Sequence, residues 1–473
     1  FSKEPPLLQT TGYKINGGRD GFEPEFRKNF DICRKTLFLA VLRLHPPENP
    51  CIIQESKHKV AHMVCTFKNK VVGHFMKTRI AAIEFGTSKI VTMIAENSGM
   101  DRLDIVGSGT VPYDGYSEGD WNTPRQMVQR VRDSIAAAEL EANSKIHEIY
   151  VGVPGEYIHV LSCEAQVDLP DGAVDETAVN AVLDQAADAL NVAQSGCRVL
   201  HRSPAWFSVD DGKKTMSPSG RGSTLRALVT FVVAEQMFIE DVSEMMGVLN
   251  GTILGFLSTT MGEGMLLLPL EDRDRAALLI DCGYLSTEIS VVEGDALIYH
   301  AMLPRGGGHV TADLATELRI SMRAAEQIKR GYVFNPDEFD RDSFSEVYDE
   351  AGNRVTFPRE VVQEIVERSV DELADMVRLT VNNDVSELLG PRSQIYLTGG
   401  GLALMRGGRE YLSEKIGRPI KVAAAKSSKM NSPVYSAALG LADLTFDSIE
   451  QHSDGEEPVF GKLRSLFRGK SEE

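Results

Sequence analysis

The stretch that decides the fold reads Ile80-Ala81-Ala82-Ile83-Glu84, Phe85-Gly86-Thr87-Ser88, Lys89-Ile90-Val91-Thr92-Met93-Ile94-Ala95. It predicts an apolar strand that ends in an acid, a tight turn and a returning strand. The pattern recurs downstream, where an apolar strand over 276–281 runs into Cys282-Gly283-Tyr284-Leu285-Ser286-Thr287 and a second strand over 288–292. The sequence therefore predicts an internal duplication on the scale of a domain.

Each hairpin is followed by a further strand and an amphipathic helix. In the first half these are the segments 103–111 and 124–141, and in the second half 296–303 and 310–330. Apolar residues alternate or run together in the strand segments and recur at helical spacing in the helix segments. We therefore expect an α/β protein with two similar lobes.

Both turns carry the residue types that suit a phosphate and its Mg²⁺. Backbone amides and hydroxyls in a Gly-containing turn can cradle phosphate oxygens, and a carboxylate at the strand end can orient metal-bound water. Taken singly, either turn is weak evidence, because most Gly-Thr-Ser turns are only turns. Two such turns facing each other would form a clamp.

A third element strengthens this interpretation. A strand over 394–397 leads into Thr398-Gly399-Gly400-Gly401 and a helix over 407–416, and such a glycine turn lets a flat ligand approach the backbone. The alternative is a flexible strand-to-helix turn. Glu326 and Lys329 form an i,i+3 pair that could bind ribose hydroxyls or could be an ordinary surface ion pair.

Composition excludes several classes of protein. The formal net charge of −18 over 473 residues argues against general nucleic-acid binding. The six cysteines lack Cys-x-x-Cys spacing, which indicates free thiols in a reducing compartment rather than disulfides or a zinc site. No run of about eighteen apolar residues predicts a membrane span.

The first 75 residues differ from the rest of the chain. They carry 12 Lys+Arg and 7 Asp+Glu, a balance of +5, so the remainder carries −18 − 5 = −23. They show no sustained helical or strand period. We expect residues 1–75 to be a non-native or disordered extension upstream of a natural start at Met76; the alternative is a genuine basic arm.

The C-terminal end predicts an amphipathic helix over 459–470 behind a polar linker over 447–458. Its apolar residues could enter a bilayer surface while its basic residues face anionic lipid. The helix could instead dock on its own domain. The predicted membrane-binding residues are Phe460, Lys462, Leu463, Arg464, Leu466, Phe467 and Arg468.

The order of these elements resembles the actin-like ATPase superfamily, and within it the FtsA family, over residues 76–473. Glu84-Phe85-Gly86-Thr87-Ser88-Lys89 is similar to the first phosphate loop of the family, Asp-x-Gly-Thr-Ser-Lys. The segment from Leu303-Pro304 to Ala325-Glu326-x-Ile328-Lys329 resembles the FtsA segment that joins the second loop to the nucleotide helix. The Gly399–Gly401 turn is similar to the adenosine motif.

The resemblance implies a two-lobed fold with ATP and Mg²⁺ in the cleft. Glu84 and Asp281 would orient Mg²⁺ through water, and Glu263 is the candidate for positioning the attacking water. Phosphates would be held by Gly86, Thr87, Ser88, Lys89, Gly283 and Ser286. The nucleoside would be held by Glu326, Lys329, Gly399, Gly400 and Gly401.

The resemblance also implies a domain plan and a set of partners. The first lobe would begin over 76–155, an FtsA-type subdomain would occupy 156–240, and the rest of both lobes would follow over 241–446. Family members polymerise, bind the FtsZ C-terminal tail, recruit other division proteins and lie on the inner face of the cell membrane at the division site. Arg368 and Glu372 are the expected FtsZ-binding residues.

Three departures from the family pattern lead to alternatives. Glu84 replaces an Asp, Tyr284 and Leu285 replace glycines of the second loop, and Ser369 stands at the usual position of an Arg. We therefore expect slow ATP hydrolysis at most. The alternatives are a nucleotide-free scaffold similar to pilus-assembly relatives and a small-molecule kinase on the same fold.

Overall fold

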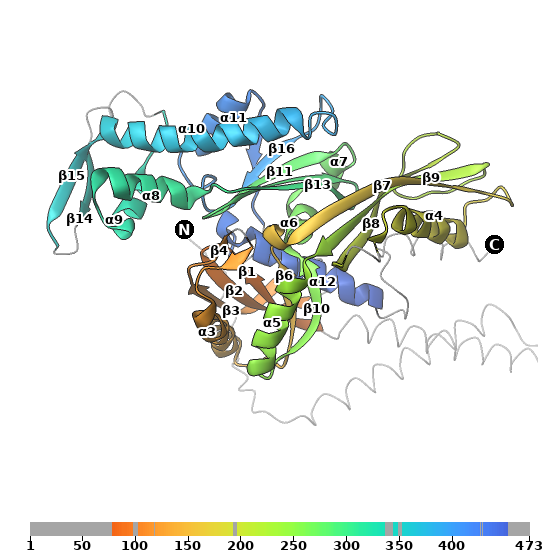
Figure 1. Ribbon diagram of the computed structural model, residues 1–473, viewed down its shortest axis with the longest axis horizontal. Helices are drawn as coiled ribbons and strands as arrows, with labels where there is room; N and C mark the ends of the chain where they lie inside the picture. Colours follow the sequence, from red (N-terminus) through yellow and green to blue (C-terminus); the bar gives the residue numbers. More distant parts are fainter. Residues whose placement is uncertain are drawn as a thin grey trace, which may run out of the picture. The chain divides into compact units, whose positions relative to one another are not determined.

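The computed structural model describes residues 78–97, 103–117, 119–192, 196–335, 344–348, 352–425, 427 and 429–452 (Figure 1). All of them belong to one compact unit, Lys77–Glu473. The predicted extension over 1–75 and the predicted tail helix over 459–470 lie outside the described residues.

The first five-stranded sheet has the order β10-β6-β1-β2-β3. Its strands are β1 (Thr78–Phe85), β2 (Lys89–Asn97), β3 (Leu103–Pro112), β6 (Glu148–Val153) and β10 (Thr252–Ser258). β1 pairs antiparallel with β2 and parallel with β6. β1 and β2 are buried along almost their whole length, as expected for strands covered on both faces.

Two helices cover opposite faces of this sheet, α3 (Pro124–Ala142) and α12 (Ser436–His452). α3 lies so close to β3 that a Cβ at Gly109 would be 1.9 Å from the Ser134 carbonyl oxygen. On the other face, a Cβ at Gly152 would be 2.8 Å from Leu441 of α12. α12 continues to His452, so the prediction of a linker from residue 447 is wrong over its first residues.

Shorter elements complete the first lobe and the connection to the second. They are the strand pair β4 (Tyr116–Ser117) and β5 (Asp120–Trp121), the turns η1 (Gly155–Tyr157) and η4 (Pro433–Tyr435), and the helices α5 (Gln236–Val248), α6 (Thr259–Leu267) and α7 (Leu270–Arg273). Ser258 caps α6 by accepting a hydrogen bond from the Met261 N–H at 3.1 Å.

The second five-stranded sheet repeats the plan of the first, with the order β13-β12-β11-β16-β17. Its strands are β11 (Ala277–Cys282), β12 (Thr287–Glu293), β13 (Ala296–Leu303), β16 (Ile395–Thr398) and β17 (Ile420–Val422). β11 pairs antiparallel with β12 and parallel with β16, as β1 does with β2 and β6. The predicted duplication is therefore present in the topology.

Helices of the second lobe are α8 (Gly307–Leu318), α9 (Met322–Gly331), α10 (Arg359–Asn383) and α11 (Gly408–Ile416). The prediction of one helix over 310–330 is wrong, because the segment forms two helices, α8 and α9, with a turn between them. Arg319 has a left-handed φ of 54° that ends α8, and Ser321 caps α9 by accepting a hydrogen bond from the Ala324 N–H at 3.3 Å. Between α9 and α10 lies an unpredicted hairpin, β14 (Phe344–Tyr348) and β15 (Arg354–Pro358).

The stretch predicted as an inserted subdomain contains its own three-stranded sheet, β7-β9-β8. Its elements are β7 (Ile158–Asp168), α4 (Glu176–Ala189), β8 (Arg198–Val209) and β9 (Thr224–Ala234). α4 packs on this sheet in a separate apolar core. The expected end at residue 240 is too late, because Phe238 and Val242 of α5 pack in the core of the first lobe.

Candidate functional site

The first hairpin turn joins β1 to β2 and is short because the Gly86 N–H donates to the Lys89 carbonyl at 3.0 Å. The Tyr113 hydroxyl donates to the Gly86 carbonyl at 2.6 Å. Glu84 points to the inside of the protein, and burial raises its pKa to about 7 against the lowering effect of Lys89. The turn therefore presents hydroxyls beside a carboxyl that is protonated more readily than usual.

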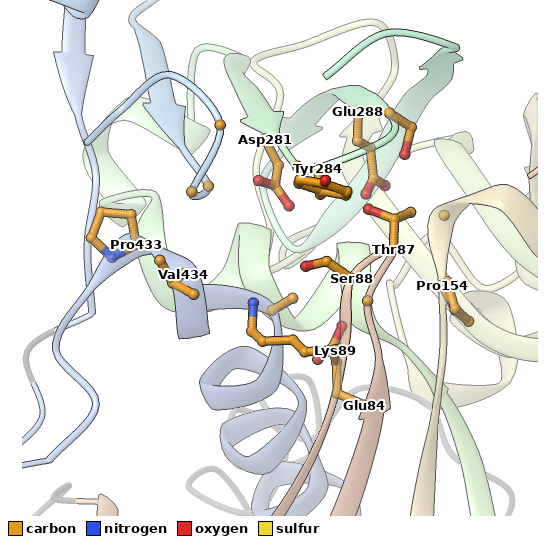
Figure 2. A pocket seen from close by; sticks show the side chains of 18 of the residues that line it. Glu84, Thr87, Ser88, Lys89, Pro154, Asp281, Tyr284, Glu288, Pro433 and Val434 are labelled. Carbon is orange, nitrogen blue, oxygen red and sulfur yellow. The ribbon is translucent and has the colours of Figure 1, made fainter. Parts of the chain in front are cut away.

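The second hairpin turn joins β11 to β12 and closes with a hydrogen bond from the Gly283 N–H to the Ser286 carbonyl at 3.0 Å. The Leu285 N–H donates to Thr87 Oγ1 at 3.1 Å. This bond spans the two halves of the duplication, so the two turns face and touch each other. Figure 2 shows Asp281 and Tyr284 on one side of the pocket and Ser88 and Lys89 on the other.

The glycine turn after β16 packs directly on the second hairpin. Gly399 has a φ of +86°, which favours glycine. The Gly401 N–H donates to the Cys282 carbonyl at 2.7 Å, and a Cβ at Gly401 would lie 2.4 Å from the Gly283 carbonyl oxygen. Glycine is thus needed here for close packing between the two turns.

Glu326 and Lys329 of α9 form a partly buried ion pair, with Lys329 Nζ 2.6 Å from Glu326 Oε2. Lys329 also donates to the Gly307 carbonyl at 2.9 Å, and the Thr311 hydroxyl donates to Glu326 at 2.6 Å. Burial by itself raises the pKa of Glu326. The hydrogen bonds from Lys329 and Thr311 outweigh this effect and lower the pKa of Glu326 below its usual value. The alternative of a loose surface pair therefore does not hold for Lys329, which is only 4% exposed.

One pocket, with a cavity of about 190 Å³, gathers almost all of the residues predicted for the nucleotide site. Those that line it are Glu84, Gly86, Thr87, Ser88, Lys89, Asp281, Gly283, Ser286, Glu326, Lys329, Gly399, Gly400 and Gly401. Tyr284 also lines the pocket, with its ring against Gly308, where a Cβ would be 2.9 Å from the ring. The tyrosine therefore narrows the pocket without filling it.

Among the residues predicted for the nucleotide site, Glu263 does not line the pocket. It is buried in α6, where burial and the charges of Asp281, Glu288 and Glu84 raise its pKa well above the usual value. Its Oε1 atom has no hydrogen-bond partner among the described residues. Glu263 is therefore close to these acids but is not part of the pocket lining.

Asp281 is the second strand-end acid, and burial together with the nearby Glu288 raises its pKa to about 7. Its Oδ1 atom is buried and lacks a hydrogen-bond partner among the described residues. Within the described part of the chain, no group of three His, Cys, Asp or Glu side chains is arranged to hold a metal ion directly. An unpartnered carboxylate of this kind fits a hydrated cation better than a directly ligated one.

Sequence reasoning missed Glu288, which lines the pocket from β12. It pairs across the hairpin with Asp281, receives a hydrogen bond from Thr260, and lies 2.8 Å from His300 Nε2. The hairpin register could have found it, because residues paired across two strands share a face. Pro433 and Val434 also line the pocket, and no pattern in the sequence pointed to them.

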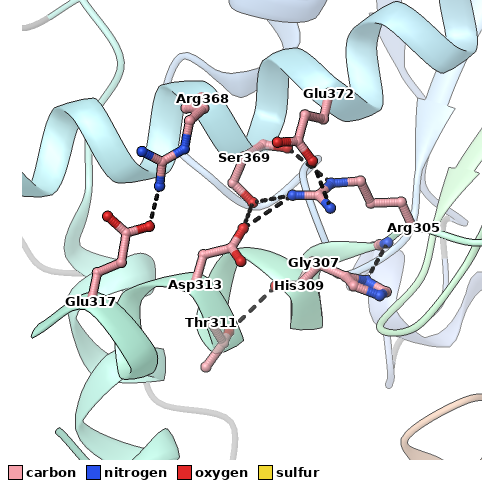
Figure 3. A network of polar contacts seen from close by, with 10 residues as sticks. Arg305, Gly307, His309, Thr311, Asp313, Glu317, Arg368, Ser369 and Glu372 are labelled. Atoms are coloured by element: carbon pink, nitrogen blue, oxygen red, sulfur yellow. Dashed lines mark hydrogen bonds and ion pairs between the residues drawn. The ribbon is translucent and has the colours of Figure 1, made fainter. Parts of the chain in front are cut away.

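The predicted partner residues lie on α10, in the polar network of Figure 3. Arg368 pairs with Glu317, and Glu372 lies 2.9 Å from Arg305 Nη1. Arg305 also donates to the Ser369 hydroxyl at 2.9 Å and to Asp313 at 3.0 Å. The small Ser369 thus leaves room beside α10 for a guanidinium that comes from the turn before α8.

The sequence was compared with families and proteins of known identity. A family model described as cell division protein FtsA matches residues 278–440. The FtsA of Pseudomonas aeruginosa is 27% identical over 384 residues, covering 80% of this chain and 90% of the relative. The FtsA of Neisseria meningitidis is 26% identical over 377 residues, covering 76% and 89%.

The chain is thus similar to FtsA proteins over about 80% of its length. A solved PilM-PilN type IV pilus biogenesis complex matches 78% of this chain and 98% of the other at a TM-score of 0.52, with 18% identity. The two-lobed actin-like fold expected from the resemblance to FtsA is therefore confirmed. None of the helices in the described ranges combines the length and apolar character needed to cross a bilayer.

Proposed function

We propose that this FtsA relative binds an adenine nucleotide with Mg²⁺ in the pocket between the two hairpin turns. The observation that carries the proposal is the convergence of both turns and the glycine turn on one cavity. The backbone N–H groups of Thr87, Ser88, Tyr284 and Ser286 donate to no acceptor among the described residues. Such amides suit phosphate oxygens, which accept several hydrogen bonds.

Each side chain has a role that follows from its position. Asp281 and Glu84 would orient the water shell of Mg²⁺, and Lys89, which faces both acids, would bind phosphate oxygens. Gly399–Gly401 and the Glu326–Lys329 pair would lie against the nucleoside. Mg²⁺ would neutralise the charge of the phosphates in an acidic pocket. Glu288, rather than Glu263, lies where it could orient a water molecule.

We further propose that nucleotide controls polymerisation, and that the polymer holds FtsZ filaments on the inner membrane face as the cell-division relatives do. The likeness to FtsA across both lobes supports this role. The face of α10 that carries Arg368 and Glu372 is the proposed contact with the FtsZ C-terminal tail. The basic and apolar residues over 460–468, outside the described part of the chain, are the proposed membrane anchor.

Co-sedimentation with liposomes tests the membrane and partner roles. The full chain is compared with a chain that ends at Gly455, with and without ATP, Mg²⁺ and an FtsZ tail peptide. We expect the full chain to pellet with anionic liposomes, more strongly when nucleotide allows polymers, because many weak anchors then act together. Leu463→Glu should abolish pelleting, whereas equal pelleting of both chains would contradict the proposed anchor.

Two other functions make different predictions. A nucleotide-free scaffold, favoured by Tyr284 and Leu285 in the second turn, predicts no change in melting temperature with ATP or ADP. A small-molecule kinase predicts ATP turnover that depends on an added sugar or acid. Melting curves with each nucleotide, followed by turnover assays with and without such acceptors, distinguish the three.

A further inference from the structure

Tyr284 belongs to the second hairpin turn by its backbone but reaches the start of α8 with its side chain. Its carbonyl accepts a hydrogen bond from the Gly308 N–H at 2.7 Å. Its ring lies against the same glycine, since a Cβ at Gly308 would be 2.9 Å from the ring atoms Cε2 and Cζ. The lack of a side chain at Gly308 therefore makes room for the ring.

The first turn of α8 is also where the residues proposed for the nucleoside meet. A Cβ at Gly307 would lie 2.5 Å from Gly401 Cα in the glycine turn. The Gly307 carbonyl accepts a hydrogen bond from Lys329 Nζ at 2.9 Å. Because the Tyr284 ring contacts the next residue, Gly308, the ring lies beside the residues proposed for the nucleoside, although the backbone of Tyr284 belongs to the turn proposed for the phosphates.

One face of the Tyr284 ring is turned towards the Glu326–Lys329 pair. Lys329 Nζ lies over the ring, 6.0 Å from its centroid. Partial burial, together with the nearby charge of Glu326, raises the pKa of the Tyr284 hydroxyl. All three side chains line the same pocket (Figure 2). A ligand that contacts the ion pair from within the pocket would therefore meet this face of the ring.

We infer that Tyr284 is an additional nucleoside-binding residue, whose ring packs against the nucleoside end of the bound nucleotide. This inference rests on the proposed nucleotide site and adds one specific contact to it. Pockets for small ligands commonly use aromatic side chains in this way, because flat groups pack well on a ring. A ring that only occupied the space of the ligand would weaken binding instead, so the two interpretations predict effects of opposite sign.

Isothermal titration of the full chain with Mg·ADP measures this sign. Tyr284→Ala should weaken the binding of ADP about tenfold, because it removes a side chain that stacks on the nucleoside. Tyr284→Phe keeps the ring and should bind ADP within about twofold of wild type. Unchanged or tighter binding by Tyr284→Ala overturns the inference, as does a Tyr284→Phe variant that binds as weakly as Tyr284→Ala.

A second ligand separates the ring from the backbone of the turn. Mg·pyrophosphate has no nucleoside, so Tyr284→Ala should bind it within about twofold of wild type. Ser88→Ala changes the phosphate half of the pocket and should weaken ADP and pyrophosphate alike. An equal loss of affinity for both ligands in Tyr284→Ala would place its effect in the phosphate half and overturn the inference. Where wild type binds pyrophosphate too weakly to measure, the comparison of Tyr284→Ala with Tyr284→Phe decides.

Failure of this inference and failure of the proposed site give different results. Wild-type protein that binds ADP, together with a folded Tyr284→Ala variant that binds ADP equally well, overturns only the role of the ring. Wild-type protein that gives neither heat nor a melting shift with ADP or ATP overturns the nucleotide site as well. Melting curves without ligand confirm that each variant is folded.

Discussion

The two hairpin turns of the pocket share one topology, yet the rest of the chain holds them very differently. The first turn is backed by the segment after β3, where the Tyr113 hydroxyl donates to the Gly86 carbonyl at 2.6 Å and the Tyr113 N–H donates to the Ser88 carbonyl at 3.1 Å. A Cβ at Gly86 itself would meet its nearest neighbour at 3.1 Å. The second turn is enclosed by Gly306, Gly308 and Gly401, each within close reach of its backbone. The first turn is therefore held by a segment of its own lobe, whereas the second, called the fixed turn below, is held by glycines at the start of α8 and after β16.

The largest expected effect comes from adding a single methyl group behind the second turn. Gly306→Ala places a Cβ 2.7 to 2.9 Å from three carbonyl oxygens of residues 283–286, so the turn or α8 must shift. We expect the free energy of unfolding to fall by about 2 to 3 kcal/mol. The matched change Gly86→Ala should cost less than about 1 kcal/mol. Urea denaturation measures both, and equal losses would contradict the contrast between the turns.

The next effect concerns the side chain that connects the fixed turn to α10. Arg305 is only 17% exposed and has partners on two helices, whereas Arg368 is 48% exposed and pairs with Glu317. Arg305→Ala removes the guanidinium that donates to Asp313, the Ser369 carbonyl and Glu372, and leaves Asp313 with the Ser369 hydroxyl as its donor. We expect a loss of about 2 kcal/mol. Arg368→Ala should cost at most about 0.5 kcal/mol, because exposed ion pairs contribute little.

Arg368→Ala, together with Glu372→Ala, also tests the proposed contact with the FtsZ tail. If α10 binds the FtsZ tail through its exposed charges, Arg368→Ala should weaken peptide binding in fluorescence anisotropy although it barely alters stability. Unchanged peptide affinity in both Arg368→Ala and Glu372→Ala would argue against this face of the helix.

The sequence predicted the features that depend on neighbouring residues better than those that depend on contacts between distant segments of the chain. Both hairpins and the glycine turn were predictable, because strand periodicity and Gly-rich turns are local signals. Glu288 could have been found from the register of the predicted hairpin, because it pairs with Asp281. The position of Arg305 depends on the packing of α8 on α10, which no local pattern encodes. The break at Arg319 was missed because a left-handed arginine leaves no glycine or proline in the sequence.

A smaller effect comes from the buried acid behind both turns. Burial raises the pKa of Glu263 well above its usual value, so the folded protein retains a proton that the unfolded chain releases above about pH 4.5. The contribution of this group to stability is therefore lost as pH rises through that window towards the raised pKa. Glu263→Gln should stabilise the protein by about 1 kcal/mol at pH 8, with a smaller gain at pH 5.

A buried acid with a partner provides the control for this change. Glu96 in β2 accepts a hydrogen bond from Arg79 Nε at 2.9 Å, so Glu96→Gln should destabilise the protein at pH 8. Denaturation at both pH values distinguishes the two acids. A Glu263→Gln variant that is less stable than wild type at pH 8 would mean that the carboxylate has a partner in solution.

The smallest effect is expected at Arg330, one of two neighbouring cations of α9 that both contact Glu326. The Arg330 side chain is 77% exposed, and its pair with Glu326 follows the i,i+4 spacing of a surface ion pair. Arg330→Ala should therefore change the free energy of unfolding by less than about 0.5 kcal/mol. Lys329 is buried and also donates to the Gly307 carbonyl beside the fixed turn, so Lys329→Ala should cost clearly more. Similar losses for both variants would show that α9 is not tied to the second turn through Lys329, and the rigidity of that turn would then rest on the glycine contacts alone.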